Sequence, residues 1–144
     1  MGRIPGRNLM KPKKLTHIGI AVNNLDEILE IFEKQFGLKC DSRIKSEPHG
    51  VEAATVHIGD AHFEFMQPLK KDSPMQRFID KKGPSIHHLS MEVDDVNEWI
   101  DKLEAGDVRM VDKRARPGVH GNPMAFIHPK STGGILVEIE QFDE

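Results

Sequence analysis

The sequence predicts an α+β fold in which two βαβββ modules form one cupped, mixed β-sheet. The first observation is an internal repeat, since LTHIGIAV (15–22) resembles IHHLSMEV (86–93) at an offset of 71 residues. The second is that a helix signal follows directly after each of these segments. The third is that GDAHFEF (59–65) resembles GGILVEI (133–139) at an offset of 74 residues, so the ends of the two halves match as well.

Each repeat begins with a strand and continues into a helix. Along residues 15–22 and 86–93, aliphatic side chains alternate with small or polar ones, as is typical of strands. Asn24 with Glu27, and Asp95 with Glu98, have the spacing of a helix N-cap and an acid at the third helical position. Apolar residues then recur at helical spacing, and a glycine stands where each helix should end. These positions are Leu25, Ile28, Leu29, Phe32 and Gly37 in the first repeat and Val96, Trp99, Ile100, Leu103 and Gly106 in the second.

Further strands are expected between these matched segments, at residues 51–58, 108–111 and 123–128. A short helix is expected over Pro74–Asp80, because Ser73 suits its cap and Pro74 suits its first helical position. Each half therefore consists of a strand, a helix and about three strands. We expect the helices to cover one side of the mixed sheet.

Composition limits the class of protein. The 144 residues correspond to a single domain at 14–144, with repeats at about 15–68 and 86–141, after a flexible basic tail at 1–13. The first 14 residues carry five basic and no acidic side chains, which leaves a net charge of −8 on the rest and argues against nucleic-acid binding. No apolar run is long enough for a membrane helix. The single cysteine, Cys40, permits no internal disulfide, so a reducing, cytoplasmic location is expected.

Strand alternation places two histidines and two glutamates on the same side of the sheet. His17 lies with Gly19 and Ala21 on one face of its strand, opposite three aliphatic side chains that should pack on the helices. His88 occupies the equivalent position in the second repeat. Glu64 and Glu138 are also equivalent, and both face away from the apolar residues on either side of them. An approximate twofold axis would bring all four side chains together.

Two imidazoles and two carboxylates form a suitable set of ligands for one divalent cation such as Zn, Mn, Co, Ni or Fe(II). Four protein ligands leave two octahedral positions for substrate oxygens, so the site could stabilise a developing enolate. His87 should point to the opposite face and contribute packing or second-shell contacts. Three other histidines have no histidine at the equivalent repeat position and are interpreted as structural: His57, His62 and His128.

The sequence resembles the vicinal-oxygen-chelate superfamily, which includes glyoxalase I, extradiol dioxygenases and methylmalonyl-CoA epimerases. Within it, the epimerases are the most similar family. The resemblance covers residues 14–141, and its most specific segments are Asp72-Ser73-Pro74 and HPKSTGGILVE (128–138). The resemblance implies the glyoxalase fold, a homodimer, and one divalent ion per chain (Co, Mn, Ni or Zn) bound by His17, Glu64, His88 and Glu138. Gln67 is a competing candidate that the repeat register disfavours.

The reaction that the resemblance implies is interconversion of the 2R and 2S forms of methylmalonyl-CoA, an acyl-CoA substrate, by abstraction of the C2 proton through a metal-stabilised enolate. The family places a catalytic glutamate two residues before a glycine, but Pro48 occupies that position here. Glu47 is therefore the predicted base and His49 the reserve, while Glu138 is a candidate for the second base. The implied substrate-binding residues are His49, His120, Gly121 and Lys130.

Three alternatives remain open at the level of sequence. A glyoxalase I-type lactoylglutathione lyase would use the same four ligands. An Fe(II) dioxygenase would need two histidines and one glutamate, without Glu64 as a ligand. A superfamily member without catalytic activity could bind a small molecule at the same place.

Overall fold

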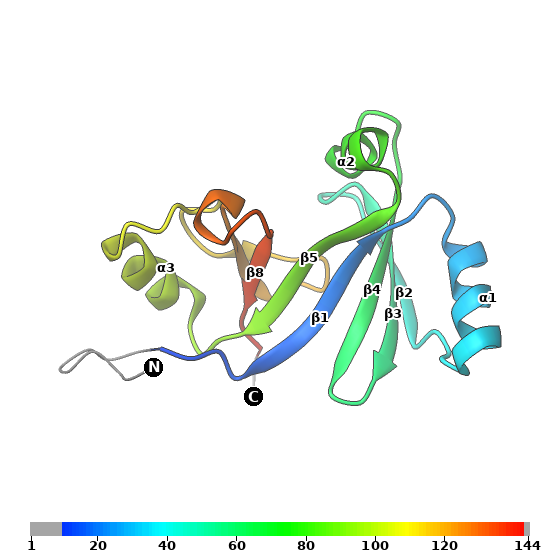
Figure 1. The fold of residues 1–144 in the computed structure, drawn as a ribbon, viewed down its shortest axis with the longest axis horizontal. Helices are drawn as coiled ribbons and strands as arrows, with labels where there is room; N and C mark the ends of the chain where they lie inside the picture. Colours follow the sequence, from blue (N-terminus) through cyan, green and yellow to red (C-terminus); the bar gives the residue numbers. More distant parts are fainter. Residues whose placement is uncertain (1–9, 143–144) are drawn as a thin grey trace.

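A computed structural model describes residues 10–142, which form one eight-stranded mixed sheet with three α-helices (Figure 1). The strand order is β2-β3-β4-β1-β5-β8-β7-β6. This arrangement confirms the predicted α+β class. The first half contains β1 (Lys14–Ala21), α1 (Leu25–Phe36), β2 (Ser42–Ser46), β3 (Val51–Ile58), β4 (Ala61–Pro68) and α2 (Pro74–Lys82). The second half contains β5 (Ser85–Glu92), α3 (Val96–Ala105), β6 (Arg116–Pro117), β7 (Pro123–Ile127), the 3₁₀ turn η1 (Pro129–Ser131) and β8 (Val137–Glu140).

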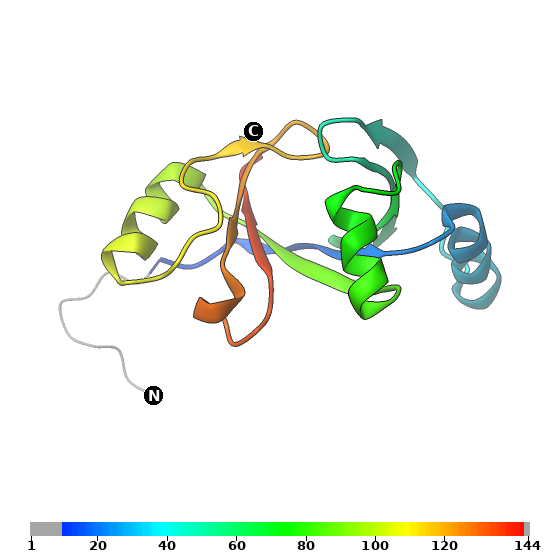
Figure 2. The same ribbon diagram turned by 90° about the horizontal axis from the view of Figure 1, so that it is seen from above.

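The two halves meet along β1 and β5, which pair antiparallel at the centre of the sheet. On one side β4 pairs parallel to β1, and on the other side β8 pairs parallel to β5. The sheet curls so that α1 lies beyond one end and α3 beyond the other, as Figures 1 and 2 show. This symmetric arrangement places equivalent residues of the two repeats around the same central pair of strands.

The predicted helix starts are confirmed. The side chains of Asn24 and Asp95 each accept a hydrogen bond from the backbone N–H three residues later, at 3.0 Å. Gln67 accepts a hydrogen bond from the N–H of Leu25, and Gln141 accepts the equivalent bond from Val96. Gln67 thus supports the start of α1, so its amide is already used at a position away from the candidate ligands.

The central strand pair contains two β-bulges at equivalent positions. The register shifts between Leu15 and His17 on β1, where Thr16 is the extra residue. It shifts again where Gly19 pairs with His88 and Ile20 pairs with Ile86, so that His87 is the extra residue on β5. A bulge locally turns the side chains of its strand. The residue that precedes each candidate histidine ligand is therefore a bulge residue.

The helices do not all lie on one side of the sheet, and the expectation is wrong for α2. Leu25 of α1 packs with Ala54 and Phe65, and Ile100 of α3 packs with Ile139, on the face opposite the candidate carboxylates. In α2, Met75 and Ile79 instead pack on the other face of the sheet. That face carries apolar side chains at the ends of the strands, and α2 packs on them; they are Ala21, Val51, Ala53 and Met66.

The predicted strand at 108–111 is also wrong. It is reduced to a single bridge between Met110 and Ile127, and the short strand β6 takes the edge of the sheet. The carboxylate of Asp112 accepts a hydrogen bond from the N–H of Phe126 at 2.8 Å. Because this side chain takes the N–H of Phe126 on β7, the backbone pairing of residues 108–111 with β7 does not continue past Asp112.

Residues 1–9 of the predicted basic tail lie outside the described residues. At its inner end, the N–H of Lys13 donates to the carbonyl of Glu92 at 2.8 Å, and its ammonium lies 2.9 Å from Asp94. The extent of a flexible tail stays a prediction. Within residues 10–142, no helix combines the length and apolar character needed to cross a membrane.

Candidate metal centre

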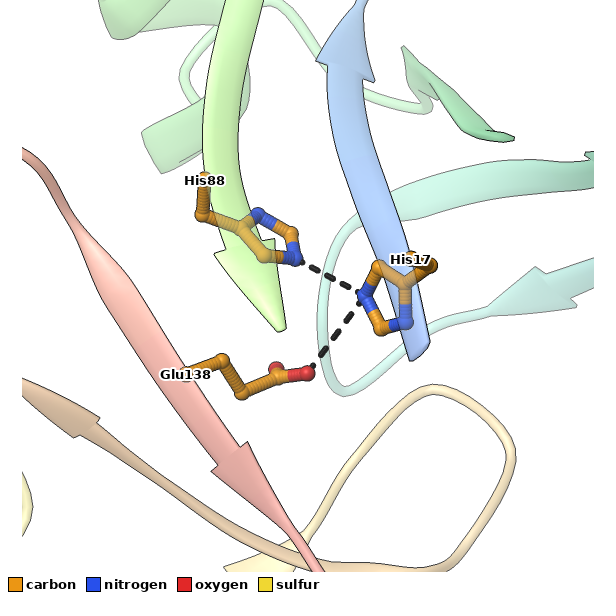
Figure 3. Close-up of side chains that lie close together, drawn as sticks. All are labelled: His17, His88 and Glu138. Atoms are coloured by element: carbon orange, nitrogen blue, oxygen red, sulfur yellow. Dashed lines mark hydrogen bonds and ion pairs between the residues drawn. The ribbon is translucent and has the colours of Figure 1, made fainter. Parts of the chain in front are cut away.

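His17, His88 and Glu138 converge from three adjacent strands, β1, β5 and β8 (Figure 3). Nε2 of His17 lies 3.0 Å from Nε2 of His88 and 3.4 Å from Oε1 of Glu138. The three side chains are buried, with exposed fractions of 3%, 4% and 6%. Two ring nitrogens and one carboxylate oxygen thus face one point at the centre of the concave face.

The strand pairing explains why these side chains meet. Gly19 pairs with His88, and Ser90 pairs with His17, so each imidazole lies beside a small residue on the neighbouring central strand. At Gly19 the approach is very close, because a Cβ atom there would lie 2.2 Å from Cε1 of His88. The absence of a side chain at Gly19 is therefore a condition for the position of the His88 ring.

Glu64 lies on the same face but belongs to an overlapping group. A ligand atom of Glu64 lies within 4.8 Å of ligand atoms of both His17 and His62. Its Oε2 is 3.3 Å from Nε2 of His120 and 4.0 Å from Nε2 of His62. The four predicted ligands therefore form two groups that share His17, and His62, interpreted from sequence as structural, is one of the potential donors.

Burial keeps the central imidazoles neutral. It lowers the pKa of His17 below its ordinary value and lowers that of His88 to about 3. Burial also lowers the pKa of His62 to about 4. A neutral imidazole has a free nitrogen lone pair, which is the form that binds metals. His120 differs, because its hydrogen bond with Glu64 raises its pKa.

Burial disfavours the charged form of the carboxylates in this site. Burial raises the pKa of Glu138 well above its ordinary value, with a further contribution from Glu140. Oε1 of Glu138 has no hydrogen-bond donor among the described residues. For Glu64, burial acts in the same direction, but the hydrogen bond from His120 and electrostatic interactions with His17 and His88 lower its pKa to about 2. A buried carboxylate with one oxygen that lacks a hydrogen-bond donor, beside two neutral imidazoles, fits a divalent cation, which would compensate a charge on it.

Glu140 is a third carboxylate on this face, 5% exposed, and its Oε1 lies 3.7 Å from Nδ1 of His17. The hydroxyl of Ser90 donates to the same oxygen at 3.3 Å. Burial, followed by the charge of Glu64, raises the pKa of Glu140 from 4.5 to about 7. At neutral pH the protein therefore contains this carboxyl partly in its protonated form when no cation is present.

Replacing Glu140 with glutamine is expected to stabilise the metal-free protein at alkaline pH. The raised pKa of Glu140 means that its contribution to folding stability is fully present below about pH 4.5 and is lost as the pH rises through about 7. Glutamine stays neutral at both pH values. The free energy of unfolding of Glu140→Gln, relative to that of wild type, should therefore be about 3 kcal/mol larger at about pH 8 than at about pH 5. Urea unfolding with a chelator at both pH values measures the difference. An equal stability difference at the two pH values would contradict the prediction.

A cavity of about 420 Å³ opens over the metal centre, between the two halves of the sheet and the N-terminal end of α2. Its wall includes the buried histidines and carboxylates described above, His17, Glu64, His88, Glu138 and Glu140. It also includes two cationic side chains, Lys70 and Arg116, of which Arg116 donates to Asp112 at 2.8 Å. An anionic, flexible ligand with one end near the metal centre would fit this combination.

The structure places three of the remaining predicted site residues at this cavity. Glu47 and His49 lie in the turn between β2 and β3, and His120 lies in the loop before β7. Nε2 of His49 is 3.0 Å from the carbonyl oxygen of Pro117, which links the first module to the second across the cavity mouth. The side chain of Glu47 is exposed to solvent at this mouth.

Two predicted substrate-binding residues do not reach the cavity. Gly121 borders a separate hollow beside Asp95 and Asn97, because the loop turns away after His120 with a φ of +88° at Gly121. Lys130 is exposed in η1, which follows β7 at the end of the strand remote from the loop that carries His120. The cations at the cavity are Lys70 and Arg116, which the sequence analysis did not select.

Sequence reasoning also missed Glu140 and Thr16. Glu140 lies two positions after Glu138, so the alternation that placed Glu138 on the concave face could have found it. The comparison of repeats passed over it because Met66 occupies the equivalent position in the first half. Thr16 required knowledge of the bulge, for which a single sequence carries no clear signal.

Comparison with known proteins places these features in context. Residues 16–126 match the model of the Glyoxalase/Bleomycin resistance protein/Dioxygenase superfamily. The chain is 38% identical over 130 residues to the mitochondrial methylmalonyl-CoA epimerase of Dictyostelium discoideum, which covers 89% of this chain and 78% of that protein.

Solved structures give a consistent result. The methylmalonyl-CoA epimerase of Mycobacterium tuberculosis superposes with a TM-score of 0.86 at 31% identity and covers 92% of this chain and 90% of its own. A methylmalonyl-CoA epimerase in complex with methylmalonyl-CoA and NH₄⁺ superposes with a TM-score of 0.85 at 26% identity, covering 91% of this chain and 95% of its own. The similarity extends over about nine tenths of the chain.

Proposed function

Since the chain belongs to the methylmalonyl-CoA epimerase family of the Glyoxalase/Bleomycin resistance protein/Dioxygenase superfamily, we propose that it interconverts (2R)- and (2S)-methylmalonyl-CoA. The observation that carries the proposal is the convergence of His17, His88 and Glu138 at the base of a cavity large enough for an acyl group. The relatives with this name, one of them bound to methylmalonyl-CoA, support the choice of substrate.

We propose that one divalent ion, Co, Mn, Ni or Zn, is held by His17, His88 and Glu138, with Glu64 as the fourth ligand. Neutral imidazoles and carboxylates suit all of these metals. Bound there, the ion would supply a Lewis acid for thioester and carboxylate oxygens and for developing negative charge. Glu64 already has a ligand atom within 4.8 Å of one of His17, and its 3.3 Å contact with His120 is the interaction it would exchange on binding the ion.

The reaction requires a proton to leave C2 on one face and a proton to return on the other. In the forward step, a carboxylate oxygen takes the proton, the C2–H bond breaks, and its electron pair moves toward the thioester carbonyl. Glu47 is our proposed base, because it borders the cavity at the mouth and its exposed carboxylate is free of the burial that affects Glu138. Glu138, at the base of the cavity, is the candidate for the acid that returns a proton.

The same cavity would orient the charged substrate. Lys70 and Arg116 provide positive charge for the anionic groups of an acyl-CoA, in a protein whose net charge is −3. His49 and His120 line the same cavity. The homodimer and the cytoplasmic location that the sequence suggests stay predictions.

The proposed function predicts solvent exchange at C2 of methylmalonyl-CoA. Incubation with the zinc- or cobalt-loaded protein in D₂O should replace the C2 proton by deuterium, which NMR and mass spectrometry detect. Formation of S-lactoylglutathione from methylglyoxal and glutathione is measured in parallel. Exchange without lyase activity supports the epimerase, whereas lyase activity without exchange would overturn the proposal in favour of a glyoxalase-type enzyme.

A further inference from the structure

His87 is close to the metal centre although strand alternation alone would direct it to the other face. Its Nδ1 lies 3.0 Å from Nδ1 of His88. The bulge on β5 explains this contact, because His87 is the extra residue opposite Gly19 and Ile20. The ring of His87 also packs edge-on against Phe78 of α2, with 4.6 Å between ring centroids. His87 is thus fixed from two sides.

The contact between the two rings determines which nitrogens carry hydrogen. A hydrogen bond between two imidazole nitrogens needs one N–H and one lone pair. Nε2 of His88 faces His17 and Glu138 and has to be unprotonated in order to bind a cation. The single ring hydrogen of neutral His88 must then be on Nδ1. Nδ1 of His87 therefore has to be the acceptor of the hydrogen bond from that N–H.

The first repeat contains the same arrangement of a bulge residue before a histidine, but the bulge residue is a threonine. Thr16 is the bulge residue before His17, and its hydroxyl donates to the carbonyl of Ser90 at 3.1 Å. Its oxygen lies 3.5 Å from Nδ1 of His17 and, with its hydrogen donated to Ser90, is available to that nitrogen as an acceptor. Each bulge therefore brings a hydrogen-bond acceptor to the inner nitrogen of the following histidine.

We propose that His87 is a positioning residue, whose unprotonated Nδ1 accepts the Nδ1–H of His88 and holds Nε2 of His88 toward the cation. The inference rests on the proposed metal centre and goes beyond it, because it assigns a role to a residue that is not a ligand. Groups that orient a ligating histidine in this way typically account for a 10–100-fold difference in metal affinity.

Three variants separate the hydrogen bond from packing. His87→Phe keeps an aromatic ring against Phe78 and removes the acceptor. His87→Asn offers an amide oxygen near the place of Nδ1 and should restore the bond. Phe78→Leu weakens the packing and keeps both histidines. Zinc affinity is measured for the full chain by competition with a chromophoric chelator.

We expect His87→Phe to weaken zinc binding by about 10–100-fold, and His87→Asn and Phe78→Leu to stay within about threefold of wild type. Equal affinity of His87→Phe and wild type would overturn the inference while leaving the metal centre intact. The inference would also be overturned if either His87→Asn or Phe78→Leu bound zinc as weakly as His87→Phe. Failure of the wild-type chain to bind zinc would overturn the proposed metal centre itself.

A second measurement needs no variant and applies even where His87→Phe does not fold. Long-range ¹H–¹⁵N NMR of the zinc-bound wild-type protein reports the protonation of each imidazole nitrogen. The expected spectrum shows Nδ1–H on His88 and an unprotonated Nδ1 on His87. A protonated Nδ1 on His87 facing an unprotonated Nδ1 on His88 would contradict the proposal.

Discussion

Replacing Glu138 with glutamine is expected to lower the rate of C2 exchange by about 1,000-fold or more, equivalent to about 4 kcal/mol of transition-state stabilisation. Glutamine removes the negative charge that a divalent ion would bind, so zinc affinity should also fall by at least about 100-fold. Because burial disfavours the charged form of Glu138 and raises its pKa, a neutral amide at this position does not add to the cost of burial. The fold should therefore tolerate Glu138→Gln.

The control for this prediction is Glu98→Gln on α3. Glu98 forms an exposed ion pair with Lys102 at 3.0 Å, far from the cavity wall. An exposed pair contributes about 0–1 kcal/mol to stability, so this variant should match wild type in exchange and in zinc affinity. If Glu138→Gln bound zinc within about threefold of wild type, Glu138 would not be a ligand.

Glu47→Gln provides a contrast, because Glu47 is proposed to act on the substrate without binding the ion. Loss of a general base typically costs about 100–10,000-fold in rate. Zinc affinity should be unchanged, since Glu47 lies in the turn at the cavity mouth. Unchanged exchange in Glu47→Gln would exclude it as the base, and His49, the next side chain at the same mouth, would become the candidate.

The sequence allowed the main geometry of the site to be predicted because the relevant signals are local and are present twice. Alternation along a strand determines which face His17 and Glu138 occupy, and the repeat shows that His88 and Glu64 are their equivalents. The helix caps at Asn24 and Asp95 depend on residues three positions apart, and both are confirmed. No distant partner is needed to interpret such signals.

The remaining features depend on contacts between distant segments. The position of α2 on the concave face follows from apolar side chains that three different strands bring together, including Ala21 and Met66. The bulges at Thr16 and His87 arise from the pairing of β1 with β5, whose paired residues lie about half of the sequence apart. The ending of the edge pairing at Asp112 depends on a single side-chain hydrogen bond to Phe126. The pattern of apolar residues within one segment does not indicate which distant segment it will contact.

The second large effect is expected from Gly19→Ala, a change of one methyl group at a residue that is neither a ligand nor a base. The added Cβ would lie 2.2 Å from Cε1 and 2.4 Å from Nδ1 of His88, which is too close for the ring to stay in place. The ring is also held by His87 at Nδ1, so it cannot move without losing that contact. We expect zinc affinity and C2 exchange to fall by about 100-fold or more, with an overpacking cost of about 1–3 kcal/mol in stability.

Gly106→Ala is the matched control for Gly19→Ala. Gly106 has a negative φ of −95°, and an added Cβ would be 3.5 Å from the carbonyl oxygen of Leu103, an ordinary contact. This variant should bind zinc as wild type does and gain about 0.4–1 kcal/mol in urea unfolding, because alanine restricts the unfolded chain. Wild-type zinc affinity in Gly19→Ala would mean that His88 can bind the ion from another position. The close packing of the two central strands would then not be what directs this histidine to the centre of the site.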